Sequence, residues 1–248
     1  SAYETVISLH KSGIEIGKII DIREKCSSLL INQVEKLGIK ILWKHTVVQT
    51  SGYKRIKSIE IMKLSENGET VIGNKIKEKC DCLGISGGWT PMVHLFTQSG
   101  GKLKFRKDDN VFVPDLDKTP SNQISVGSCN GDFELEDVIK NTLLSVKKFI
   151  NIKDTNLDDL KIVCSKETSK KNIWLLPSDK PLSKTKPFLD FQNDSTAKDV
   201  KLALREGFKS IEHVKRYTTT GMGTDQGKLS NMHALGIIAD TTGTNMGE

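Results

Sequence analysis

The sequence predicts an α/β protein in which a doubly wound parallel sheet is followed by a small helical domain. Before residue 45, two helical stripes alternate with two short apolar strands, and glycines separate these elements. A connector rich in Lys, Asp and Ser follows, and helical spacing without strands resumes beyond it. We therefore expect a dinucleotide-binding domain over residues 1–150, a connector over 151–186, a helical domain over 187–243 and the start of a linker at 244–248.

Composition limits the classes of protein to be considered. The chain has 248 residues and a formal charge of +6, but its charges are interleaved and no block of five like charges occurs. This dispersion gives no support for a nucleic-acid or membrane partner, and no run approaches the roughly 18 apolar residues that span a bilayer. The five cysteines show neither a disulfide framework nor zinc spacing, so no metal site is predicted. We expect a cytoplasmic protein.

The first elements are defined by spacing and by glycine. A helical stripe ends at Gly13, a strand runs to Asp21, a second stripe ends at Gly38, and the strand 39–42 follows. In a nucleotide-binding unit of this type, an acid at the end of the second strand binds the ribose. Asp21 is the candidate, although exposed acids at strand ends are also common without any ligand.

The middle of the chain predicts more strands and one long helix. Residues 46–64 alternate well enough for two strands, and Asn67-Gly68 predicts a hairpin turn. Further strands are expected at 80–85, 111–113 and 123–127, and short elements at 162–164 and 174–175. Residues 134–150 form the amphipathic helix that would close the first domain.

Three helices are expected after the connector. Asp194 or Ser195 caps the first, which ends at Gly207. The second begins after Ser210 and would stop at Gly221, and the third covers residues 229–240.

The second of these helices leads into a run that suits an anion. Its candidate ligands are three cations, three threonine hydroxyls and one amide: Lys215, Arg216, Lys228, Thr218, Thr219, Thr224 and Gln226. Nearby glycines would let backbone N–H groups approach a phosphate closely. The alternative is a solvated helix face followed by an ordinary turn.

Two runs carry a resemblance to a known family. Residues 214–228 (Val-Lys-Arg-Tyr-Thr-Thr-Thr-Gly-Met-Gly-Thr-Asp-Gln-Gly-Lys) and residues 188–199 (Phe-Leu-Asp-Phe-Gln-Asn-Asp-Ser-Thr-Ala-Lys-Asp) resemble the alpha subunit of heterotetrameric sarcosine oxidase. The resemblance implies an internal piece of an oxidoreductase that demethylates sarcosine with O₂, giving glycine, H₂O₂ and a one-carbon unit for tetrahydrofolate. It also implies beta, gamma and delta subunits as partners and a small amine as substrate.

The same resemblance implies the cofactors. FMN would lie at the border with the beta subunit, with its phosphate in the cradle of residues 215–228, while FAD and tetrahydrofolate would bind elsewhere in the complex. This segment would bind NAD and contribute no catalytic residue, so the piece alone is expected to be inactive. Two alternatives stay open: the alpha subunit of a related amino-acid or opine dehydrogenase, and a non-catalytic scaffold.

The first domain also resembles the Rossmann-like domains of pyridine nucleotide-disulfide reductases. Ser1-Ala2-Tyr3-Glu4 resembles the tail of their glycine loop, which makes the domain N-terminally incomplete. Ser86-Gly87-Gly88-Trp89-Thr90-Pro91 and Val126-Gly127-Ser128 resemble later segments, and Gly88 and Gly127 would allow close approach of the dinucleotide. Because flavin-binding relatives carry Asp where this chain has Ser128, the resemblance favours NAD over FAD. The alternative is that these two segments are ordinary turns that bind no dinucleotide.

The helical domain resembles a 2Fe–2S ferredoxin-like domain that lacks its cysteines. The four ligand positions are occupied by Asp190, Gln192, Asp225 and Ser230. Since such a cluster requires soft thiolate ligands, no 2Fe–2S centre is expected here.

Overall fold

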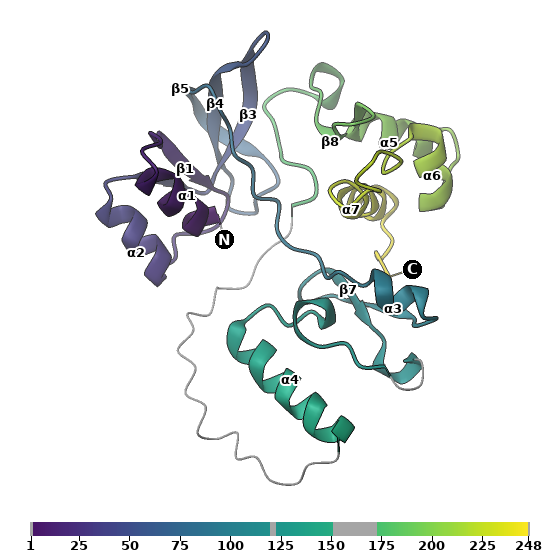
Figure 1. Ribbon diagram of the computed structural model, residues 1–248. Coiled ribbons are helices and arrows are strands. Elements are labelled where there is room, and N and C mark those ends of the chain that lie inside the picture. The colour runs from purple at the N-terminus through teal and green to yellow at the C-terminus, as the bar shows by residue number, and fades with distance from the viewer. Residues whose placement is uncertain (1, 120–122, 151–172, 248) are drawn as a thin grey trace. The chain divides into compact units, whose positions relative to one another are not determined.

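The computed structural model describes residues 2–119, 123–150 and 173–247 (Figure 1). These residues divide into two compact units. The first consists of residues 2–85 and 173–246, and the second of residues 86–119, 123–150 and Gly247. The predicted short element at 162–164 lies outside the described residues.

The N-terminal part of the first unit is a small α/β layer. Helix α1 (Ala2–Lys11) and helix α2 (Leu29–Lys36) pack against the parallel strands β1 (Lys18–Asp21) and β2 (Lys40–Trp43). Both helices end before a glycine in the left-handed region, as the sequence predicts. The buried residues of this layer are Tyr3, Ile7, Ile31, Val34 and Ile39. The α–β alternation is confirmed, but in the described residues the parallel sheet has two strands.

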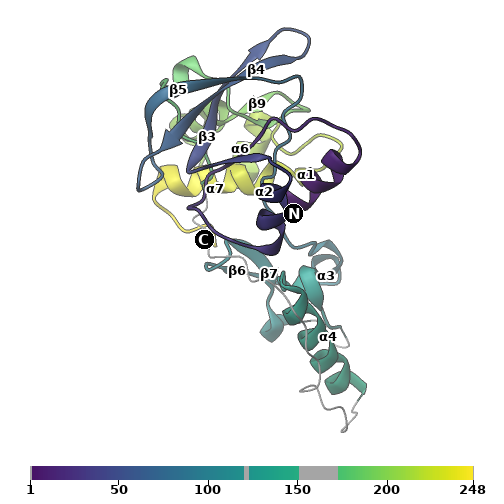
Figure 2. The same ribbon diagram turned by 90° about the vertical axis from the view of Figure 1, so that its left-hand side faces the viewer.

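An antiparallel sheet follows in the same unit. Strands β3 (His45–Gly52), β4 (Ile56–Leu64) and β5 (Val71–Lys79) lie side by side in that order (Figure 2). Strand β4 is central and holds most of the buried apolar side chains. The hairpin predicted at Asn67-Gly68 is present, and Gly68 has a φ of +72°.

The helical part of the first unit begins with a short ladder, β8 (Phe188–Asp190) with β9 (Ser195–Thr196). Helices α5 (Ala197–Arg205), α6 (Ile211–Thr218) and α7 (Asn231–Thr242) then surround one apolar core. Its fully covered members include Val200, Val214 and Ile237. Trp174, Leu175 and Leu182, from the predicted connector, also pack on it, and a Cβ on Gly236 would lie 2.2 Å from the indole of Trp174.

Several predicted helix ends in this part are wrong. Thr196 precedes α5 in place of Asp194 or Ser195, and its backbone N–H donates to the Asp199 carboxylate at 2.8 Å. Helix α6 ends at Thr218, because Thr219 already has a φ of +59° and the Thr218 hydroxyl donates back to the Val214 carbonyl at 2.8 Å. Helix α7 begins two residues after the predicted Leu229.

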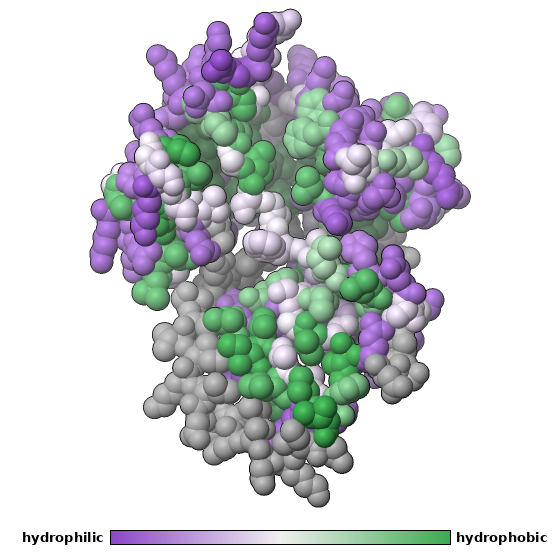
Figure 3. Space-filling model, viewed as in Figure 1, coloured by the Kyte–Doolittle hydropathy of each residue, from purple (hydrophilic) through white to green (hydrophobic). Residues whose placement is uncertain are grey.

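The second unit has fewer residues than the first, and fewer of its side chains are buried. It contains α3 (His94–Gln98), the hairpin of β6 (Leu103–Arg106) with β7 (Val111–Pro114), the 3-10 turns η1 (Leu116–Lys118) and η2 (Gly127–Asn130), and α4 (Leu135–Ile150). Phe96, Val111 and Val113 are buried. No described residue of α4 is buried, and apolar side chains gather on the visible face that carries this helix (Figure 3).

Two predicted strands are absent from the described residues of the chain. Residues 80–85 and 123–127 form no ladder, and Ile85 and Ile124 are exposed. A strand needs a continuous partner for its backbone N–H and C=O groups, and these two segments pair with no described strand, although the Cys80 N–H donates to the Lys57 carbonyl at 3.3 Å. Their apolar composition therefore does not produce the strand that it predicts.

Candidate functional site

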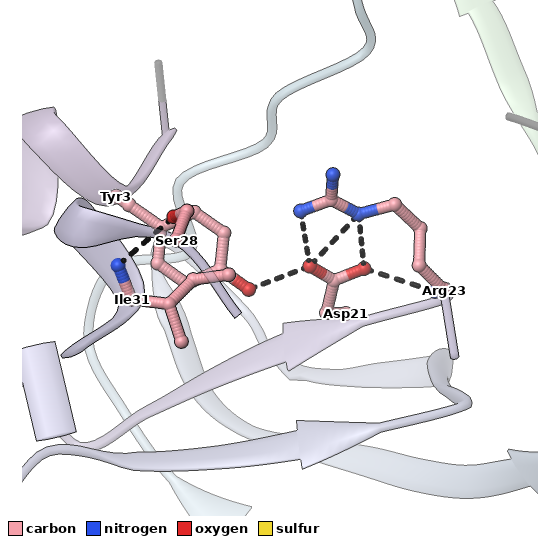
Figure 4. Close-up of polar contacts among 5 residues, drawn as sticks. All are labelled: Tyr3, Asp21, Arg23, Ser28 and Ile31. Carbon is pink, nitrogen blue, oxygen red and sulfur yellow. Dashed lines mark hydrogen bonds and ion pairs between the residues drawn. The ribbon is translucent and has the colours of Figure 1, made fainter. Parts of the chain in front are cut away.

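The first candidate position is Asp21, at the C-terminal end of β1. Its carboxylate accepts a hydrogen bond from the Tyr3 hydroxyl at 2.6 Å (Figure 4). Arg23 supplies the other donors: its backbone N–H at 2.9 Å and its Nη2 at 2.9 Å, with Nε within 3.2 Å of both carboxylate oxygens. Helix α1 thus supplies the phenol, and the turn after β1 supplies the guanidinium.

Electrostatics keep this carboxylate ionised. Burial by itself would raise the pKa of Asp21, but the hydrogen bonds from Arg23 and Tyr3 and the positive charge of Arg23 hold it below its ordinary value. Burial and the neighbouring carboxylate raise the pKa of Tyr3, so its proton stays on the phenol. The Arg23 guanidinium also lies 5.9 Å from the centre of the Tyr3 ring.

This arrangement bears directly on the predicted ribose contact. A carboxylate offers about four acceptor positions, and Tyr3 and Arg23 already occupy that number. The residues as placed therefore do not fit a ribose diol unless Arg23 or Tyr3 withdraws. The other predicted dinucleotide contacts, Gly88 and Gly127, belong to the second unit; both have a positive φ, +98° and +71°.

The second candidate position is the loop between α6 and α7, residues 219–230. Asp190, at the end of β8, is 4% exposed and accepts four hydrogen bonds from N–H groups. Three come from its own corner: Gln192 N at 2.8 Å, Asn193 N at 3.1 Å and Asn193 Nδ2 at 3.1 Å. The fourth comes from the backbone of Gly221 at 2.8 Å and joins the corner to the loop.

Further contacts fix the same loop. The Gln192 side-chain oxygen accepts from the Thr224 N–H at 2.6 Å and from the Thr224 hydroxyl at 2.7 Å. Inside the loop, the Asp225 carboxylate accepts from the N–H groups of Gly227 at 3.2 Å and Leu229 at 3.3 Å. Three of the positions that correspond to cluster cysteines in the ferredoxin-like domain, Asp190, Gln192 and Asp225, thus carry oxygen acceptors that bind the backbone, whereas the buried Ser230 hydroxyl has no partner among the described residues. The ferredoxin-like character of this helical unit is not established by its fold.

The predicted phosphate ligands fall into two groups in the structure. The hydroxyls of Thr218, Thr219 and Thr224 all donate within the chain, and the Gln226 amide donates to the Gly223 carbonyl at 2.9 Å. Lys215, Arg216 and Lys228 form no ion pair within the part of the chain that the structure describes. The three cations are therefore without an acid partner among the described residues, whereas the hydroxyls as oriented do not donate to an anion.

Two more features help to delimit the site. A shallow cleft of about 280 Å³ lies beside the loop, between the β8–β9 turn, β9, α5 and α6; its lining is Asn193, Asp194, Ser195, Asp199, Leu202, Tyr217 and Thr218. It holds none of the three cations. Within the described ranges, no group of three His, Cys, Asp or Glu side chains is arranged to hold a metal ion.

Sequence patterns do not reveal the residues that build both positions. Arg23 carries no motif, Tyr3 stands only in the Ser1–Glu4 run, and the link between Tyr3 and Asp21 spans 18 residues. Asp190 and Gln192 were noted only as replacements for cysteine. The one local signal is that Asp190 and Gln192, two alternate positions before the capped helix α5, carry hydrogen-bonding side chains and not apolar ones.

No helix among the described residues has the length and apolar character needed to cross a membrane.

Comparison of the fold with solved structures gives the fold class of the chain. The fold is shared with the crystal structure of L-proline dehydrogenase from P. horikoshii, at a TM-score of 0.64 and 20% identity, over 96% of this chain and 48% of that one. This likeness confirms an α/β fold.

Sequence comparison then gives the relatives. Sarcosine oxidase subunit alpha from Corynebacterium sp. (strain P-1) is 31% identical over 98% of this chain and 25% of its own length. The subunit alpha from Rhizobium meliloti (strain 1021) is 29% identical over 100% of this chain and 24% of its own. Residues 184–248 match the family model described as the sarcosine oxidase A3 domain. The predicted resemblance to the alpha subunit of sarcosine oxidase is confirmed, and the chain spans about a quarter of those relatives.

Proposed function

We propose that this chain is part of the alpha subunit of a heterotetrameric sarcosine oxidase and that its helical unit contributes to an FMN site. The complete enzyme would oxidise sarcosine with O₂ to glycine and H₂O₂ and pass the one-carbon unit to tetrahydrofolate. FMN, when bound, supplies an electron carrier between the amine-oxidising flavin and oxygen. The partners would be beta, gamma and delta subunits, with FAD and tetrahydrofolate bound outside this segment.

One observation carries the proposal: a loop that is fixed by side chains of the chain itself lies in the part that matches the sarcosine oxidase A3 domain. Lys215 and Arg216 precede this loop and Lys228 lies in it, none of them paired with a described acid. Cations without a partner attract a phosphate, and a fixed loop lowers the entropic cost of binding it. The role of these residues is binding and orientation, and the amine is oxidised elsewhere.

We also propose that NAD binds the N-terminal part of the first unit through Asp21, while Gly88 and Gly127 stay candidate dinucleotide contacts of the second unit. The support is the position of Asp21 at the carboxyl end of a parallel strand. Because Arg23 now occupies that carboxylate, binding requires Arg23 to turn away from it.

The experiment removes the cations from the intact complex. Lys215→Ala with Arg216→Ala is expected to release FMN and leave FAD in place, because each lost phosphate contact costs about 1.5–3 kcal/mol. Both flavins are quantified after purification of the complex through this subunit.

Lys201→Ala with Lys209→Ala is the matched control, since it removes the same charge from the same helical unit outside the loop. FMN content should stay at the wild-type level in this control. An unchanged FMN content in the Lys215/Arg216 variant would contradict the FMN assignment. If sarcosine does not reduce the flavin of the complex but another amino acid does, the dehydrogenase alternative is favoured.

A further inference from the structure

The loop of residues 219–230 is held by contacts that come from both of its flanks. On the β8 side, Asp190 accepts the Gly221 N–H and Gln192 accepts the Thr224 N–H, so two points of the loop backbone are bonded to one corner. Asn193 adds a third link, because its Nδ2 donates to the Thr219 carbonyl at 3.1 Å. These bonds connect residues that lie 26 to 32 positions apart in the sequence.

On the α7 side, the side chain of Asn231 lies between two glycines of the loop. A Cβ on Gly221 would lie 2.1 Å from Asn231 Oδ1, and a Cβ on Gly227 would lie 2.2 Å from Asn231 Nδ2. Both glycines also have a left-handed φ, +74° and +75°. The amide therefore fills the space that side chains at 221 and 227 would need, and it keeps the two ends of the loop close together.

Asp190 suits this task because it is a permanent charge in a covered position. Burial would raise the pKa of Asp190, but the N–H groups of Gly221, Asn193 and Gln192 hold it below its ordinary value. An ionised carboxylate accepts without donating, so every N–H directed at it is satisfied. An amide of the same shape would direct two of its own protons at these donors.

We infer that Asp190 and Asn231 are positioning residues, which hold the loop of residues 219–230 in one shape before any ligand binds. The inference rests on the proposed function in one respect, that this loop is the FMN-binding segment. The loop shape itself depends only on contacts within the chain. Both residues act through the backbone of the loop, and the cations remain the groups that contact the ligand.

Hydrogen exchange of the intact complex, read by mass spectrometry, tests this inference. Asp190→Asn should speed exchange of the amides in residues 219–230 by about tenfold or more, the equivalent of one lost charge-assisted hydrogen bond. The FMN content of the same samples should fall even though Lys215, Arg216 and Lys228 are intact.

Asp199→Asn is the matched control. Asp199 also accepts a backbone N–H, that of Thr196, at the start of α5. Its replacement should speed exchange at residues 196–199 and leave the loop and FMN content as in wild type. Such a result separates loop positioning from a general loss of stability in the helical unit.

Asn231→Ala is the second variant, which keeps every Asp190 bond and removes only the side chain between the glycines. It should also speed exchange in the loop. If neither variant changes exchange in residues 219–230, the positioning role is wrong. If exchange rises while FMN stays bound, the loop shape is not needed for the cofactor. If both variants speed exchange while the Lys215/Arg216 variant retains FMN, the positioning role stands and the proposed function fails.

Discussion

Two buried carboxylates, Asp21 and Asp190, lie at the ends of short strands in the same compact unit. They are 9% and 4% exposed, and both have a pKa below the ordinary value. The donors differ. Asp21 is satisfied mainly by the side chains of Tyr3 and Arg23, whereas Asp190 is satisfied mainly by backbone N–H groups.

This difference decides what each position can do. A guanidinium side chain changes rotamer at modest cost, so the donors of Asp21 are exchangeable for those of a ligand. Backbone N–H groups move only when the loop itself moves. The end of β1 is therefore suited to exchange partners, and the end of β8 is suited to fix a loop.

The largest expected effect tests whether the loop bonded to Asp190 is fixed. Gly221→Ala places a Cβ in the space of the Asn231 side chain and also puts Ala at a φ of +74°. The backbone strain costs about 1–2 kcal/mol and the overpacking about 1–3 kcal/mol more. The free energy of local opening of the helical unit, from hydrogen exchange, is expected to fall by their sum.

Gly243→Ala supplies the comparison, because Gly243 has a φ of +69° and nothing within 4 Å of an added Cβ. It should show the strain without the overpacking. Equal losses in the two variants would mean that Asn231 yields freely, and the fixed loop would then be refuted.

The second-largest expected effect tests the pairing of Asp21 with Arg23. Arg23→Gln removes the guanidinium from Asp21 and is expected to cost about 1.5–3 kcal/mol, the value of a hydrogen bond to a charged group. Burial is then opposed by fewer donors, so the pKa of Asp21 should rise from its lowered value. Carboxyl-carbon NMR titration measures this pKa, and urea unfolding measures the cost.

The sign of the pH dependence follows from the same shift. In the wild type, the lowered pKa of Asp21 gives stability that is complete above the ordinary Asp pKa of about 3.9 and is lost as the pH falls through the folded-state value. In Arg23→Gln the pKa of Asp21 is lowered less, so this contribution should shrink and less stability is lost as the pH falls. The pKa of Asp190 should not move, and an unchanged pKa for Asp21 would contradict the pairing.

How much of the fold the sequence could predict depended on the range of the contacts. Periodicity and glycine predicted α1, α2, α4 and the hairpin at Asn67-Gly68, because these signals act over a few residues. The strands expected at 80–85 and 123–127 needed neighbours that local pattern cannot supply. The end of α6 differs from the prediction because the chain already enters the left-handed region at Thr219, two residues before the more permissive Gly221.

The candidate site divides in the same way. The cations and hydroxyls stand in one local run, so residue type alone predicted them as a group. The engagement of the Thr224 hydroxyl by Gln192 was hidden, because 32 positions separate the two residues. The role of Asp190 was hidden for the same reason: its decisive bond is to Gly221, 31 positions away.

The smallest expected effect compares helix starts near the two carboxylates. Ser28 accepts the Ile31 N–H at 3.3 Å at the start of α2 (Figure 4), and Asp199 accepts from Thr196 N and Thr196 Oγ1 at 2.8 and 2.7 Å at the start of α5. Asp199→Ala should cost about 1–2 kcal/mol and Ser28→Ala about 0.5–1 kcal/mol, since the longer neutral contact is the weaker one. Hydrogen exchange of the first turns of α2 and α5 gives both values. A larger loss in α2 than in α5 would contradict the ranking of the two caps by charge and contact length.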